Sequence, residues 1–70
     1  MTVQSDLKKA IAAAESAKGS YATFAKATED QMAKAMFLQM ADDMDRHIQQ
    51  LNSRLNYLRQ NNPMNQSQQQ

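Results

Sequence analysis

The sequence predicts an all-α protein, an antiparallel two-helix hairpin that forms a four-helix bundle as a homodimer. Its composition favours helices, because Ala, Gln, Met, Leu and Lys are abundant while the 70 residues include only one Gly and one Pro. A sheet would need turn residues that are missing here. Apolar residues recur in alternating steps of four and three, which is the spacing of helices that pack along one face.

An unbroken heptad seam predicts the first helix over about residues 3–27. Its members are Val3, Leu7, Ala10, Ala14, Ala17, Tyr21, Phe24 and Thr28. Ile11 and Ala25 widen this seam on one flank, whereas Lys8 and Glu15 fall away from it. We therefore expect one face of this helix to be buried.

The second helix is predicted over about residues 29–60. Thr28 and Gln31 have the spacing of a capping box at its start, and Pro63 lies just beyond its end. Its apolar residues are Met32, Met36, Phe37, Met40, Ala41, Met44, Ile48, Leu51, Leu55 and Leu58. Two successive steps of four, from Met40 to Met44 and on to Ile48, predict that this seam drifts locally from a strict heptad.

One hairpin domain then occupies residues 1–60, followed at residues 61–70 by a Gln- and Asn-rich tail that we predict to be disordered. With a turn near residues 27 and 28, the numbers of facing residues add up to about 58. This register pairs Ala14 with Met44 and Val3 with Leu55, so that small residues face large ones.

A hairpin of this size cannot cover its apolar residues on every side, so we expect a homodimer, with a tetramer as the alternative. The second helix outruns the first by about one to two turns, which leaves Leu55, Tyr57 and Leu58 as preferred contacts. The predicted interface comprises Leu7, Ile11, Met36, Met40, Met44, Ile48, Leu51, Leu55, Tyr57 and Leu58.

Charge and composition argue against several classes of function. Eight Lys and Arg balance seven Asp and Glu, unlike the strongly basic composition of a dedicated nucleic-acid binder. There is no Cys for disulfides or thiolate sites, and no apolar run that predicts membrane insertion or a signal peptide. Without a nucleophile and base pair or a Gly-rich phosphate loop, we expect no enzyme and no cofactor.

Met32, Met36, Met40 and Met44 stand four residues apart and form an oblique stripe on the second helix. Core packing is the interpretation that we favour. An adaptable surface for partner helices and a Cu(I) site remain as alternatives, because thioethers can serve either purpose.

His47 and Asp43 lie one turn apart, and we expect them to form a surface ion pair. A metal site completed by a second chain is the alternative, because one His and one carboxylate make an incomplete ligand shell. Residues 37–47 also resemble a ligand helix of rubrerythrin and other ferritin-like bundles. Those proteins carry a Glu three residues before the His, where this chain has Met44.

Read as a whole, the chain resembles a short family called domain of unknown function 1657, from endospore-forming bacteria. The positions that carry the resemblance are Met1, Thr2, Val3, Ser5, Lys8, Phe24, Ala25, Thr28, Asp30, Ala33, Lys34, Phe37, Ile48, Leu51, Arg54 and Pro63. The resemblance implies an association with sporulation, because such genes often accompany those of a spore membrane channel.

We therefore expect a non-enzymatic helical interaction or scaffold protein, an accessory of sporulation. Its expected partners are a second copy and an unidentified protein, for which a spore membrane protein is the candidate. Its expected location is the cytoplasm, including that of the forespore or spore. The alternative function is a ferritin-like, metal-binding half-bundle whose site is shared between chains, with His47 and Asp43 as the candidate ligands.

Overall fold

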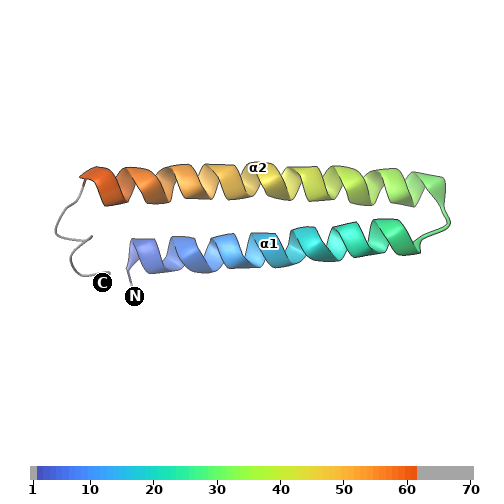
Figure 1. The fold of residues 1–70 in the computed structure, drawn as a ribbon, viewed down its shortest axis with the longest axis horizontal. Coiled ribbons are helices and arrows are strands. Elements are labelled where there is room, and N and C mark those ends of the chain that lie inside the picture. Colours follow the sequence, from blue (N-terminus) through green and yellow to red (C-terminus); the bar gives the residue numbers. More distant parts are fainter. Residues whose placement is uncertain (1, 62–70) are drawn as a thin grey trace.

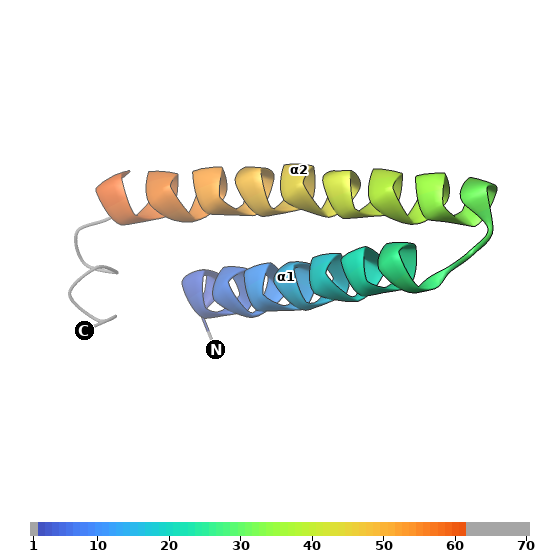
Figure 2. The same cartoon turned by 45° about the vertical axis from the view of Figure 1, so that its right-hand side comes forward.

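The computed structural model describes residues 2–61, which form two α-helices joined by a short connection. Helix α1 spans Val3–Ala27 and helix α2 spans Gln31–Asn61, and they lie side by side in opposite directions (Figure 1). A view turned by 45° shows the same pairing, with the two axes crossing at a shallow angle (Figure 2). The predicted all-α hairpin is confirmed, whereas its pairing into a four-helix bundle stays a prediction.

Helix α1 begins and ends at residues whose backbone is extended. The side chain of Thr2 caps the start, because its hydroxyl oxygen accepts a hydrogen bond from the amide of Ser5 at 3.0 Å. At the other end the amide of Thr28 still donates to the carbonyl of Phe24 at 3.0 Å before the chain leaves the helix. Both ends thus satisfy backbone groups that a helix would otherwise leave open.

Helix α2 begins two residues later than the capping-box pattern predicts. Asp30 caps it, because its carboxylate accepts from the amide of Ala33 at 3.2 Å, while Thr28 instead accepts from the amide of Asp30 at 3.1 Å. A carboxylate suits this position better than a hydroxyl, since its charge also meets the positive end of the helix. The helix continues to Asn61, and the predicted tail beyond that residue lies outside the described residues.

The seam of α1 differs from the predicted one at every second position. Gln4, Ala14 and Ala25 are buried, whereas Val3 is 63% and Phe24 49% exposed. The heptad positions that face α2 are position a, held by Gln4, Ile11, Lys18 and Ala25, and position d, held by Leu7, Ala14, Tyr21 and Thr28. The prediction was right for position d. It was wrong in pairing d with position g instead of position a, because α1 is apolar at all three positions and either pairing gives a seam with heptad spacing.

The seam of α2 follows strict steps of three and four. Its members are Lys34, Phe37, Ala41, Met44, Ile48, Leu51, Leu55 and Leu58. Ala41 is buried at 8% exposure and takes the place that the prediction gave to Met40, which lies at the edge of the seam. The predicted local drift near Met44 is therefore wrong.

The two seams align in a register in which the numbers of facing residues add up to about 62, not 58. The rings of Phe24 and Phe37 lie 5.5 Å apart, and the ammonium of Lys18 lies 2.7 Å from Asp45. The shift of about one turn arises because the extended connection carries the chain past the end of α1 before α2 returns.

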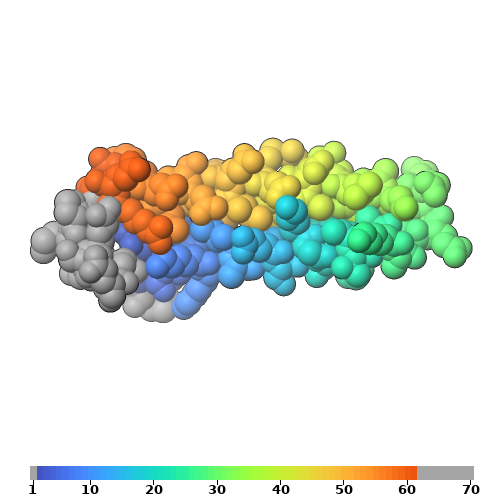
Figure 3. Space-filling view, viewed as in Figure 1, coloured from blue at the N-terminus to red at the C-terminus, as the bar shows by residue number. Residues whose placement is uncertain are grey.

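This register explains which residues are buried. It places Ala25 opposite Phe37, Ala41 opposite Tyr21 and Ala14 opposite Ile48, so that each alanine faces a large side chain. Leu55 lies opposite Leu7 and is only 4% exposed. The expectation that Leu55 lacks cover from its own chain is therefore wrong, because the longer register brings α1 beside it. The surfaces of both helices meet along the described hairpin (Figure 3).

Candidate interaction surface

The hairpin has two long sides that differ in chemistry. In an antiparallel pair, the e positions of both helices flank the seam on one side, and the g positions flank it on the other. The e side carries Lys8, Glu15 and Ala22 from α1 and Leu38, Asp45, Asn52 and Arg59 from α2. We call it the charged side.

The opposite side is formed by the g positions and the neighbouring c positions, and we call it the apolar side. Its apolar members are Val3, Ala10, Ala13, Ala17, Phe24 and Ala27 from α1 and Ala33, Met36, Met40 and Tyr57 from α2. Its polar members are Asp6, Ser20, Asp43, His47, Gln50 and Arg54. On α1 the two positions nearest this side, d and g, hold no charged residue.

The charged side is occupied by contacts within the chain. Lys18 extends from the seam toward it and pairs with Asp45, and both side chains are about half exposed. The hydrogen bond from Lys18 to Asp45, together with the negative charge of that carboxylate, raises the pKa of Lys18 above its ordinary value. Because the group is open to solvent, this pair contributes little beyond helping to fix the register.

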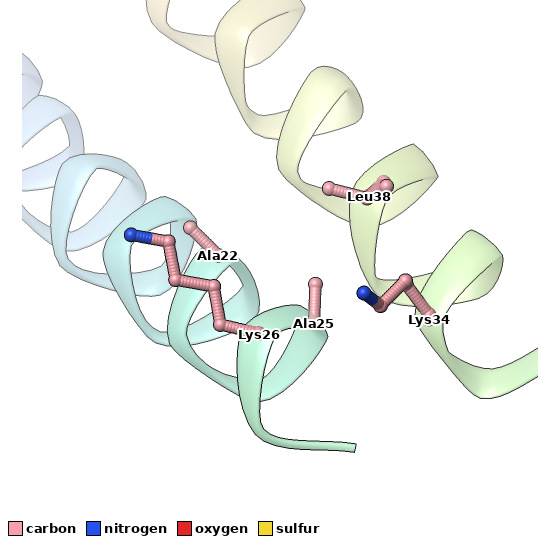
Figure 4. Close-up of a pocket in the computed structure, with 5 residues that line it drawn as sticks. All are labelled: Ala22, Ala25, Lys26, Lys34 and Leu38. Atoms are coloured by element: carbon pink, nitrogen blue, oxygen red, sulfur yellow. The ribbon is translucent and has the colours of Figure 1, made fainter. Parts of the chain in front are cut away.

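A shallow pocket of about 170 Å³ also opens on the charged side, near the connection (Figure 4). Ala22, Ala25 and Leu38 form its floor, and Lys26 and Lys34 border it. The Asp30 carboxylate, one turn before Lys34, caps α2. The pocket is the gap left beside two small side chains of α1, Ala22 and Ala25, where they face α2.

Exposed large apolar side chains gather on the apolar side. Of six such residues within 2–61, four lie there: Val3 at 63%, Phe24 at 49%, Met36 at 58% and Tyr57 at 53% exposure. Leu38 lies on the charged side, and Met32 faces outward near the start of α2. Val3 and Tyr57 form one exposed pair near the open end, and Phe24 and Met36 form another near the connection.

The residues predicted to form an interface are divided between the seam and the surface. Leu55 is buried, and six others are half-buried along the seam within the hairpin: Leu7, Ile11, Met44, Ile48, Leu51 and Leu58. Met40 lies half-buried at the edge of the apolar side, whereas Met36 and Tyr57 are exposed on it. Only these last three of the predicted interface residues therefore lie outside the seam of the hairpin.

Sequence reasoning missed the contribution of α1 to this surface. Val3, Ala10 and Ala17 were predicted to contact α2 but lie on the apolar side, whereas Phe24 borders that side and does pack its ring against Phe37 of α2. The signal was present, because α1 is apolar at positions a, d and g rather than at a and d alone. A stripe of three positions is typical of a helix with more than one neighbour.

The methionine stripe runs from the outer surface into the seam. Met32 is 78% and Met36 58% exposed, whereas Met40 and Met44 are half-buried. The stripe thus combines core packing at one end with a soft, adaptable surface at the other.

Asp43 does not pair with His47 in the described chain. Its carboxylate accepts hydrogen bonds from Arg46 and from the side-chain amide (Nε2) of Gln39, the latter at 3.1 Å, while His47 is exposed. The predicted His47 ion pair is wrong, because the guanidinium of Arg46 reaches the Asp43 carboxylate three residues away. Across residues 2–61, no three His, Cys, Asp or Glu side chains converge on a point that could hold a metal ion.

Neither helix in the described part of the chain is both long and apolar enough to cross a membrane. No curated protein and no solved structure is similar enough to be matched with this chain. The profile of one family, described as a protein of unknown function (DUF1657), matches residues 7–55. That match spans more than half of the chain and covers most of the seams of both helices. The chain therefore belongs to this DUF1657 family.

Proposed function

We propose that this protein is a non-enzymatic interaction protein, and that its apolar side binds a second copy to complete a four-helix bundle. The observation that carries the proposal is that four of the six exposed large apolar side chains within residues 2–61 lie on one side of the hairpin: Val3, Phe24, Met36 and Tyr57. The adjoining d and g positions of α1 add no charge that such contact would have to desolvate.

The test compares two substitutions at equally exposed positions on opposite sides. Met36→Lys places a charge on the apolar side, and Leu38→Lys places one on the charged side, from side chains that are 58% and 52% exposed. We expect sedimentation equilibrium to show a dimer for the wild type and for Leu38→Lys, and a monomer for Met36→Lys. A protein concentration of about 100 μM lies well above the dissociation constants of ordinary complexes. A wild type that stays monomeric at that concentration would contradict the proposal. So would equal effects of the two substitutions.

The alternative function, a ferritin-like half-bundle with a metal shared between chains, has less support. Asp43 is already engaged by Arg46 and Gln39, which leaves His47 as the one candidate ligand of the original pair without a competing contact in the described chain. Elemental analysis of the purified protein checks this alternative. Stoichiometric metal that is lost in His47→Ala would favour it over the proposal.

The spore context is a separate part of the proposal and is supported by family membership alone. An accessory protein of sporulation would present the remaining helix faces of its bundle to another protein, for which a spore membrane protein is the candidate. Abundance of the protein through a sporulation time course checks this context. A constant level in growing and sporulating cells would argue against it.

A further inference from the structure

We infer that the pocket on the charged side is a docking site for an acidic peptide segment of another protein, which inserts one large apolar side chain between Lys26 and Lys34. The inference goes beyond the proposed dimer, because the pocket lies on the opposite side of the hairpin from the apolar side. Three observations support it: the size of the pocket, its apolar floor, and the two ammonium groups that border it.

The pocket has room for one side chain rather than for a whole metabolite. Its volume is about 170 Å³. A cavity of about 150 Å³ accepts one benzene ring, whereas sites for drug-sized ligands usually occupy about 300–1,000 Å³. A single leucine or phenylalanine side chain, presented by a larger partner, fits this volume. Anchors of this kind contribute much of the affinity at protein interfaces.

The floor of the pocket is apolar and lacks cover. Leu38 is 52% exposed, and of the six exposed large apolar side chains within residues 2–61 it is the one that lies on the charged side. Ala22 and Ala25 present only methyl groups across from it, so a gap stays open between the two helices (Figure 4). An apolar side chain of a partner would remove this surface of Leu38 from water, which is favourable.

The ammonium groups that border the pocket have no counter-ion in the described part of the chain. The side chain of Lys34 reaches from α2 toward Ala25, and that of Lys26 runs back along α1 past Ala22 (Figure 4). Neither lysine forms an ion pair within residues 2–61. The nearby carboxylate of Asp30 is engaged at the start of α2 instead.

The next positions toward the open end show a different arrangement. One heptad from Ala25 and Leu38 lie Lys18 and Asp45, whose side chains pair with each other at 2.7 Å. The cation at that level is therefore neutralised within the chain, whereas the two cations at the pocket are available to carboxylates of a partner. A segment with acidic residues beside one large apolar side chain matches both the floor and the border of the pocket.

Titration with short peptides, followed by NMR of the backbone amides, tests the inference in the full-length protein. The probe is a peptide, blocked at both ends, that has a leucine between two pairs of glutamates. We expect saturable shifts at Ala22, Lys26, Lys34 and Leu38. A peptide with alanine in place of leucine should bind at least about fivefold more weakly, because it buries less apolar surface. Replacing the glutamates by glutamines should weaken binding about two- to tenfold at low salt.

Two substitutions with matched controls locate the binding. Ala22→Leu fills the pocket from an exposed position and keeps every charge, and Ala12→Leu makes the same change at an exposed position of α1 away from it. Lys26→Gln removes one cation of the pocket, and Lys8→Gln removes one elsewhere on the charged side. We expect Ala22→Leu to abolish the shifts and Lys26→Gln to weaken binding about two- to fivefold. Both controls should bind as the wild type does.

Three results would overturn the inference. Equal binding of the leucine and alanine peptides, or binding that Ala22→Leu leaves unchanged, would mean that the pocket holds no anchor. No saturable shift with up to about 10 mM peptide would mean that the pocket does not bind such a segment. Shifts at the same residues with phosphatidylglycerol vesicles but not with the peptide would assign the pocket to a membrane surface.

The proposed dimer is tested separately, so the two failures are distinguishable. A wild type that is monomeric in sedimentation equilibrium but binds the leucine peptide would support this inference and contradict the dimer. A wild type that is dimeric but fails to bind the peptide would overturn this inference and leave the dimer intact.

Discussion

At the scale of single residues, two polar side chains in the seam depart from a simple apolar core. Lys18 occupies a seam position but extends its ammonium to Asp45 at the surface, so its aliphatic stem covers the seam while its charge stays solvated. Gln4 is 1% exposed, and neither its amide nitrogen nor its amide oxygen has a hydrogen-bond partner within residues 2–61. The polar group of Lys18 therefore has a partner, whereas the buried amide of Gln4 lowers the stability of the hairpin.

We predict that Gln4→Leu stabilises the hairpin by about 1–3 kcal/mol, because it removes an unsatisfied buried amide and faces Leu58 in the seam. Chemical denaturation measures the change in free energy of unfolding. Gln49→Leu, at an exposed position of α2, is the control and is expected to be nearly neutral. A loss of stability in Gln4→Leu would indicate that the amide has a partner after all.

The Lys18 pair makes a prediction about alkaline pH. Because Asp45 raises the pKa of Lys18, its contribution to stability is fully present below the unfolded value of about 10.4 and is lost as the pH rises through the folded value. Asp45→Asn should therefore lower the pKa of Lys18, measured by NMR titration of its side chain. Asp42→Asn, which acts on Lys18 only through a weaker charge interaction, should shift it less.

At the scale of elements, the two helices could be predicted from the sequence because their apolar periodicity is unbroken. The choice between two possible seams of α1 could not be made from the sequence. Leu7 and Tyr21 form an equally regular heptad pattern with Val3 and Phe24 or with Gln4 and Ala25. The register could not be fixed either. It depends on how far the connection travels before α2 begins, and two good caps, Thr28 and Asp30, compete for that start.

The packing of α1 against α2 is tested at Ala14, which is 8% exposed and lies opposite Ile48. We predict that Ala14→Leu lowers the free energy of unfolding by about 1–3 kcal/mol, because the seam has no room for the added carbons. Ala12→Leu at an exposed position of the same helix is the matched control. Equal denaturation midpoints for the two variants would mean that Ala14 does not face α2.

The start of α2 is tested at its cap. Asp30→Ala removes the acceptor for the amide of Ala33 and should lower stability by about 0.5–2 kcal/mol. Glu29→Ala changes an exposed neighbour in the same connection without removing a capping bond, and we expect little effect. Thermal or chemical denaturation compares the stabilities of the two variants. An Asp30→Ala variant as stable as the wild type would indicate that Thr28, not Asp30, caps α2.

At the scale of the whole molecule, the apolar side could be found only once the seam of α1 was known. The sequence shows three apolar positions per heptad, but which two face α2 decides which one is left for a partner. Leu55, Tyr57 and Leu58 illustrate the difficulty, because the first is buried, the second exposed and the third half-buried in the register that the hairpin adopts.

Association of hairpins predicts that thermal stability depends on concentration. We expect the melting temperature of the wild type and of Leu38→Lys to rise as protein concentration increases, since a partner that binds only the folded state stabilises it. Met36→Lys should melt at a constant temperature. A wild type whose melting temperature does not change across a hundredfold range of concentration would be inconsistent with a dimer.

The hairpin brings Val3 and Asn61, the first and last helical residues, to the same end of the molecule. Anything attached beyond either helix would therefore leave from that end.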